Sequence, residues 1–121
     1  KNNKVVKAEL RYFSIYTIGV AVASNLDEVV VYPNPVNFSK AIRGTIKFEN
    51  LTKNAKIKIF DITGRLVRTL NPGTAENDGL TGKAEWNGKN EDGEVVGMGL
   101  YIYLIIDEED HKKCGKIGVV K

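Results

Sequence analysis

Residues 55–70 read AKIKIFDITGRLVRTL, and this stretch predicts the fold class. Buried-type and solvent-type positions alternate from Ala55 to Ile59, which is the period of a strand with one buried face. Asp61-Ile62-Thr63-Gly64 supplies a turn with Gly64 where a positive φ is needed, and Arg65–Leu70 returns as a second strand. The stretch therefore predicts an antiparallel β-hairpin.

The same two-residue period recurs along most of the chain. Further strands are expected over four segments: Ala41–Glu49, Lys83–Trp86, Leu100–Ile106 and Lys112–Lys121. In the first of these, the alternate residues expected to share one face are Ile42, Gly44, Ile46 and Phe48, with Lys47 on the other face. Gly, Asn and Asp fill the connections, and no segment shows a convincing helical period. The pattern predicts an all-β protein, an Ig-like antiparallel β-sandwich of about seven strands over residues 27–121.

Length and composition exclude several classes of site. The chain has 121 residues, with Cys114 as its one cysteine and His111 as its one histidine. A lone cysteine rules out an internal disulfide and a cysteine-based zinc site, and a lone histidine rules out a multi-histidine metal centre. We therefore expect one globular domain with no cofactor and no metal.

Charge is distributed unevenly along the chain. The net charge of +3 arises in residues 1–11, and residues 12–121 carry equal numbers of acidic and basic side chains. Within this part, residues 37–70 are mainly basic and residues 71–110 mainly acidic. Lysines that alternate with isoleucines along a strand are typical of a solvated sheet face, so we expect no nucleic-acid partner. The separation of charge favours head-to-tail contacts between copies.

Residues 1–26 contain more strand-like sequence than a small sandwich needs. The apolar residues of this additional long N-terminal strand are Leu10, Tyr12, Phe13, Ile15, Tyr16, Ile18, Val20 and Val22. Polar breaks and tyrosines argue against a signal peptide, although Ala21-Val22-Ala23 resembles a cleavage site, and the run is too interrupted for a membrane span. Two hypotheses remain open: the end of a preceding domain, or a strand donated to a sheet edge of this chain or of a neighbour.

Six short motifs follow one another in the remainder of the chain. They are Val31–Pro35, Gly44–Phe48, Ile57–Arg68, Trp86–Gly93, Gly99–Tyr103 and Lys116–Lys121. From Val29 onward this order resembles the Ig-like domain family of the flagellar hook-capping protein FlgD and the related C-terminal sorting domains of type IX secretion. Asn87 and Gly118 depart from the family pattern.

The residues that the resemblance singles out also have physical interpretations. They are Pro33, Pro35, Gly64, Trp86, Gly99, Tyr101, Lys116 and Lys121. The two prolines cannot donate ladder hydrogen bonds, so they suit a sheet edge or a switch between sheets. Trp86 suits a core position beneath a turn, and Gly97 and Gly99 suggest a bulge around Met98.

Reactive chemistry is sparse in this sequence. His111 and Cys114 are the only pair available for a nucleophile and its base, and residues three apart on a strand point to opposite faces. We expect no catalytic residue and no enzyme. The acidic run Asp107–Asp110 suits either a hard cation or simple solvation, and Asn37 and Asn50 each match the N-glycosylation pattern.

The resemblance implies a secreted protein that works outside the cell or on a bacterial cell surface. The expected function is a sorting and surface-attachment module. The alternative is a self-assembling subunit of an extracellular filament, joined to its neighbour by N-terminal strand donation. The expected partners are other protein chains, either copies of this chain or an upstream domain of the same protein.

Overall fold

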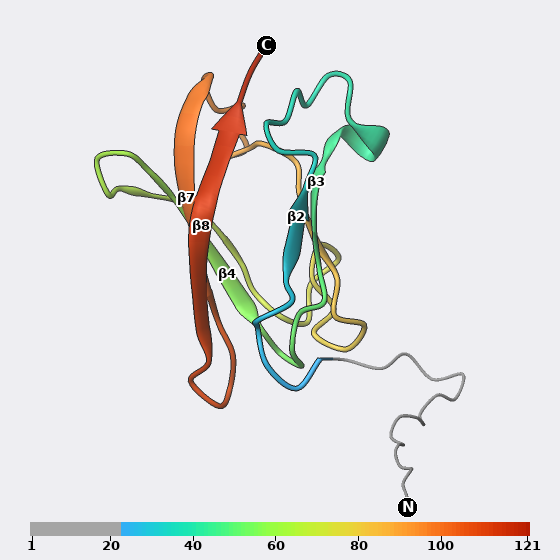
Figure 1. Cartoon of the computed structure of the whole chain (residues 1–121). Helices are drawn as coiled ribbons and strands as arrows, with labels where there is room; N and C mark the ends of the chain where they lie inside the picture. Colours follow the sequence, from blue (N-terminus) through green and yellow to red (C-terminus); the bar gives the residue numbers. More distant parts are fainter. Residues whose placement is uncertain (1–22) are drawn as a thin grey trace, which may run out of the picture.

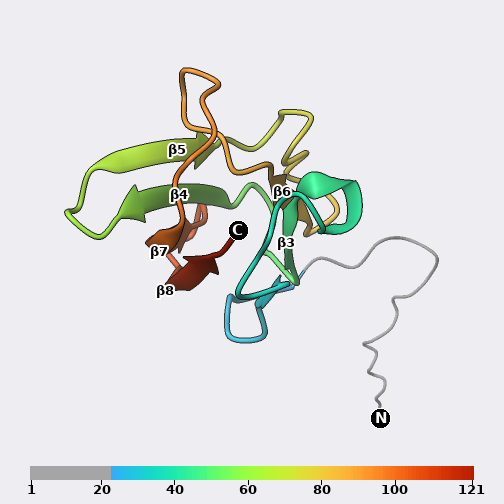
Figure 2. The ribbon, with the colours of Figure 1, turned by 90° about the horizontal axis from the view of Figure 1, so that it is seen from above.

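The computed structural model describes residues 23–121 of the chain (Figure 1). This part contains seven strands and one short 3-10 turn, joined by turns and loops. One antiparallel sheet has the order β2-β3-β6, formed by Val30–Tyr32, Ile46–Glu49 and Ala84–Trp86. The other has the order β5-β4-β7-β8, formed by Leu66–Leu70, Lys56–Asp61, Gly99–Ile106 and Lys112–Val119. This two-layer arrangement, seen from above in Figure 2, confirms the all-β sandwich. The predicted N-terminal strand residues, from Leu10 to Val22, lie outside the described part.

The predicted hairpin forms from β4 and β5. Asp61 closes its turn, because Oδ1 accepts the backbone amides of Thr63 at 2.9 Å and Arg65 at 3.1 Å. Gly64 has a φ of +89°, a value that side chains disfavour, so glycine suits this turn position. The hydroxyl of Thr63 and these amides lower the pKa of Asp61. The hairpin is therefore specified by residues close together in sequence.

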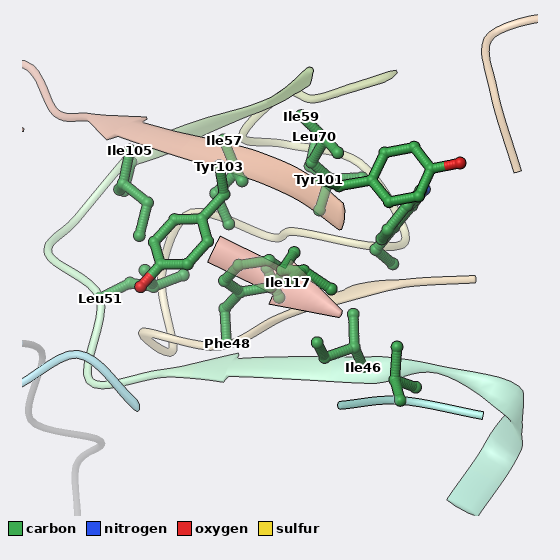
Figure 3. Close-up of a cluster of buried hydrophobic side chains, with 14 of the residues drawn as sticks. Ile46, Phe48, Leu51, Ile57, Ile59, Leu70, Tyr101, Tyr103, Ile105 and Ile117 are labelled. Atoms are coloured by element: carbon green, nitrogen blue, oxygen red, sulfur yellow. The ribbon is translucent and has the colours of Figure 1, made fainter. Parts of the chain in front are cut away.

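The core fills the space between the two sheets (Figure 3). Trp86 is fully buried, with its ring edge-to-face against Phe38 at a centroid distance of 5.3 Å and against Tyr101 at 5.9 Å. Its indole Nε1 donates to the carbonyl of Lys89 at 2.9 Å, which ties the core to the loop after β6. Phe48 packs in the same manner on Tyr103, at 5.6 Å. Aromatic contacts thus link one sheet to the other.

The expected strand over residues 41–49 is wrong in its first half. Ile42–Gly44 forms a 3-10 turn, and the side chain of Ile42 is 75% exposed rather than buried. Arg43 has a φ of +60°, which a continuing strand does not permit, so β3 starts only at Ile46. Lys47, expected in solvent, is 8% exposed, because its ammonium donates to the carbonyls of Ile42 and Thr45. The turn therefore covers a position that the alternation assigned to solvent.

Gly115 in β8 lies directly beneath the ring of Tyr103. A Cβ placed at this glycine would come within 2.4 Å of the tyrosine hydroxyl and 2.5 Å of Cζ. The two residues are register partners across β7 and β8, and the Tyr103 ring is buried with Phe48 packed against it. Burial raises the pKa of the Tyr103 hydroxyl. The glycine therefore makes room for a core aromatic ring.

We expect Gly115→Ala to lower the free energy of unfolding by about 1–3 kcal/mol, because the added methyl group must displace the buried ring. Gly97→Ala is the matched control, since its Cβ would meet no atom within 4 Å. The control should leave stability unchanged or raise it by up to about 1 kcal/mol. Urea unfolding of both variants measures the difference, and equal midpoints for the two would contradict the packing described here.

Candidate functional site

β8, the last strand, is an edge of the four-stranded sheet. One side of it pairs with β7 along the full strand, from Gly99↔Val119 to Ile106↔Lys112. Its other side carries the backbone N–H and C=O groups of alternate residues, which point away from β7. Such groups are able to pair with a further strand. Whether the rest of the chain covers them therefore decides where another strand can bind.

A strap, defined here as residues 33–36, crosses from one sheet to the other and covers one end of this edge. β2 pairs with β3 up to Tyr32, and Val36 then forms a parallel bridge to Val119 in the opposite sheet. The Val36 amide donates to the carbonyl of Gly118 at 2.7 Å, and the Val120 amide donates to the carbonyl of Val36 at 2.9 Å. Pro33 and Pro35 lie within this switch between sheets, and both prolyl bonds are cis.

Asn34 completes the strap with its side chain. Its Nδ2 donates to the carbonyl of Lys116 at 2.8 Å, and its Oδ1 accepts the amide of Gly118 at 3.0 Å. The carboxamide thereby pairs with β8 as a neighbouring backbone would. A Cβ on Gly118 would lie 3.3 Å from Cβ of Pro35, so a glycine allows the strap to lie close. Sequence reasoning missed Asn34, although its place between two residues that lack N–H groups was the available signal.

The N-terminal half of β8 has no further strand beside it among the residues that the structure describes. Among residues 23–121, no backbone or side-chain group bonds to the outward amides of Lys112, Cys114 and Lys116. The side chains of these three residues are exposed, and Cys114 is a free thiol. Lysines on an edge oppose uncontrolled pairing between copies. The edge is therefore divided into a closed half under the strap and an open half flanked by positive charge.

The boundaries of this arrangement coincide with a known family. The secretion system C-terminal sorting domain matches residues 30–119, from the first residue of β2 to the last residue of β8. The chain belongs to this family. Membership confirms the expected secreted, cell-surface location and the type IX part of the predicted resemblance. The predicted likeness to the flagellar hook-capping domain stays a prediction. No curated protein sequence matches the chain at a significant level.

Two solved structures from Porphyromonas gingivalis are similar to the sorting domain. PorZ, described as an essential bacterial surface component of the type IX secretion system, is 29% identical with a TM-score of 0.64. The similarity covers 82% of this chain and 12% of PorZ. Latent dimeric PorU is 24% identical with a TM-score of 0.51, over 76% of this chain and 9% of PorU, and supports the fold. The sorting domain thus corresponds to a small fraction of much longer proteins.

The residues singled out from sequence do not gather at one place in the sorting domain. Pro33, Pro35 and Lys116 meet where the strap crosses β8, with Lys121 just beyond the strand. Trp86 and Tyr101 are buried, and the Tyr101 hydroxyl donates to the carbonyl of Gly97 at 2.8 Å. Gly99 opens β7 with a φ of +145°, and Gly64 lies in the β4–β5 turn. Only the first group therefore lies at the β8 edge, at the end that the strap closes.

The acidic turn between β7 and β8 is organised by Asp107. Its Oδ1 accepts the amides of Glu109 and His111, and its Oδ2 lies 2.7 Å from Nδ1 of His111. The Asp107 carboxylate raises the pKa of His111. Burial acts to raise the pKa of Asp107, but the hydrogen bonds from the His111 ring and from the backbone amides of His111 and Glu109 help to lower it. Residues 23–121 hold no cluster of three or more His, Cys, Asp or Glu suited to a metal ion.

The two glycosylation motifs lie in turns. Asn37 Oδ1 accepts the amide and hydroxyl of Ser39, which places this asparagine within its own turn. Asn50 is exposed with a φ of +64°, and its Nδ2 donates to the carbonyl of Glu28 at 3.1 Å. Glycosylation at either residue stays a prediction. Across the described residues, no helix has the length and apolar character needed to cross a membrane.

We expect Asn34→Ala to lower the free energy of unfolding by about 1–2 kcal/mol, because two hydrogen bonds to β8 are lost at a solvent-exposed site. Amide hydrogen exchange at Gly118 should accelerate, since its N–H loses its acceptor. Asn25→Ala is the control, because Asn25 accepts the nearby amide of Asp27 and forms no hydrogen bond with β8 within residues 23–121, so Gly118 should stay protected. Unchanged exchange at Gly118 in Asn34→Ala would show that the carboxamide does not hold the edge.

The His111–Asp107 pair predicts a pH dependence of stability. The raised pKa of His111 means that its contribution is complete below its unfolded value of 6.5 and is lost as pH rises through the folded value. The lowered pKa of Asp107 means that its contribution is present above 3.8 and is lost as pH falls through the folded value. The stability advantage over His111→Gln should therefore be largest between these two pH values. Chemical unfolding of both chains from pH 3 to pH 9 measures it, and a constant difference would contradict the pairing.

Proposed function

We propose that this chain is a non-enzymatic sorting module that directs the export of an upstream passenger protein and its attachment to the cell surface. The observation that carries the proposal is the family match over residues 30–119, which ends on the edge strand β8. The similarity to PorZ, a surface component of the type IX system, supports the same assignment. The similarity covers only 12% of PorZ. We therefore assign sorting to this module and any further activity to the passenger protein.

The absence of catalysis is part of this proposal. His111 is bonded to Asp107 in the β7–β8 turn, so its Nδ1 is engaged in holding the turn. Cys114 is exposed on β8, where its outward backbone amide has no partner among residues 23–121. We assign both residues to the architecture of β8 rather than to chemistry.

β8 is the element that we propose is recognised during export. The strap fixes the closed half of β8. The open half is therefore already in a strand conformation before a partner binds. Pairing of a partner strand with this edge therefore costs less conformational entropy than pairing with a free, unfolded terminus. Lys112 and Lys116 beside the open amides select an acidic partner strand over a basic one.

The test is the delivery of a reporter. Residues 1–121 are fused behind a folded passenger in a bacterium that has a type IX secretion system, and surface exposure is measured by protease accessibility on intact cells. We expect the fusion to reach the surface and the passenger alone to stay inside. A fusion that is folded but retained within the cell would contradict the sorting function.

The role of the open edge is tested by Cys114→Pro. The amide of Cys114 points away from β7, so proline removes a donor from the edge without removing a bond of the sheet. We expect surface delivery to fall by about tenfold or more while the melting temperature stays close to that of the unchanged chain. Cys114→Thr retains the amide and should be delivered normally. Normal delivery of a folded Cys114→Pro variant would show that recognition does not use this edge.

A further inference from the structure

β7 is apolar on both of its faces, although only one face belongs to the core. Tyr101, Tyr103 and Ile105 point inward, and the residues between them point outward from the four-stranded sheet. We call this outward set the β7 stripe: Leu100, Ile102, Leu104 and Ile106. Leu100 is 44% exposed and Ile102 is 39% exposed, and the other two are half-buried. Strands apolar on both faces are typical of sheets that are covered on both sides.

Lysines border the β7 stripe on both sides. Ile106 is paired with Lys56 of β4 on one side and with Lys112 of β8 on the other. Lys58 lies beside Leu104, and Lys116 lies beside Ile102. The outward positions of β4, β7 and β8 include no acidic residue, and no acid of residues 23–121 forms an ion pair with these four lysines. The face is thus an aliphatic stripe flanked by two lysines on each side, with Phe60 and Cys114 as the uncharged neighbours and Asp107 and Glu108 close to Lys56 and Lys58 at one end.

The outer face of the three-stranded sheet provides an internal comparison. Its charged groups are partnered within the chain: Arg43 pairs with Glu85, and Glu49 accepts the hydroxyl of Tyr32. The ammonium of Lys47 is bonded to backbone carbonyls. One outer face therefore satisfies its own charges, whereas the other presents lysines of one sign around apolar side chains. The difference indicates that the second face is built for an acidic partner.

Geometry restricts the form of that partner. Neighbouring strands are about 4.8 Å apart, so the rows on β4 and β8 lie about 10 Å apart, close to the diameter of an α-helix. The backbone of β7 is already paired with β4 and β8, so an occupant must satisfy its own hydrogen bonds, as a helix does. The stripe is about 20 Å long, which matches a helix of about 14 residues.

We propose that the β7 stripe is a docking site for an amphipathic helix of a partner protein, with acidic residues on both sides of the helix's apolar face. A second copy of this chain docked face to face would oppose lysines to lysines. A flat bilayer would meet the ends of the lysines before it met the shorter side chains between them. This inference adds a partner to the proposed sorting module, and it is tested on the purified chain so that its failure is distinguishable from a failure of export.

The probe is a synthetic 14-residue peptide with leucines at helical spacing and glutamates on both flanks. A matched peptide carries lysine in place of each glutamate. Binding to the full chain is followed by backbone amide chemical shifts and by the helical circular dichroism of the peptide. We expect the acidic peptide to bind and to gain helicity on binding. The amide chemical shifts of β4, β7 and β8 should change, and the affinity should fall as the salt concentration is raised.

Charge reversal on the face supplies the decisive variant. The double variant Lys58→Glu with Lys116→Glu should lower the affinity for the acidic peptide by about tenfold or more, and it should allow the lysine peptide to bind. The control variant Lys53→Glu with Lys89→Glu changes the net charge by the same amount at exposed positions outside the face. It should leave the preference for the acidic peptide over the lysine peptide unaltered.

Four results would overturn the proposal. They are equal binding of the two peptides, shifts confined to the three-stranded sheet, binding without gain of helicity, and concentration-dependent self-association of the chain through β7 in the absence of peptide. Vesicles of phosphatidylglycerol form a separate arm of the experiment. Vesicle binding that shifts the same amides and excludes the acidic peptide would assign the face to a membrane and would also overturn it.

Discussion

The pairing of the strap with β8 is the contact on which the rest of the structure depends. It joins the first described strand, which belongs to the three-stranded sheet, to the last strand of the four-stranded sheet. The contact has two backbone hydrogen bonds through Val36 and two side-chain hydrogen bonds through Asn34. It holds the two layers at the separation that Trp86, Phe48 and the two core tyrosines fill. The strap also sets which part of the β8 edge is closed.

The composition of the strap follows from that task. Pro33 and Pro35 lack N–H groups, so within this segment the donors toward β8 are the Asn34 carboxamide and the Val36 amide. Gly118 provides the space that Pro35 needs on the opposite side of the contact. Asparagine and glycine are therefore complementary, although 84 positions separate them. The departure from the family pattern at Gly118 has a packing reason and is compatible with a folded terminal strand.

Local features of the fold were predictable from sequence, and contacts between distant residues were not. The hairpin of β4 and β5 and the alternation in β7 depend on neighbouring residues, so periodicity and turn chemistry were sufficient. The strand expected from Ala41 failed because alternation carries no information on φ, and Arg43 takes a positive value there. Asn34 was missed because its partners, Lys116 and Gly118, are identified only once the chain has folded back.

Charge shows most clearly what folding adds to the sequence. Lysines from two distant segments, Lys56 and Lys58 in one and Lys112 and Lys116 in the other, are brought to one face because β7 pairs with both β4 and β8. Acids that balance them in number lie at one end of this face, where Asp107 and Glu108 line a pocket with Lys56 and Lys58, and on the three-stranded sheet at Glu85. A chain that is neutral from residue 12 onward thus gathers four lysines on one face of one sheet. Strand order therefore determines which charges become neighbours on this face.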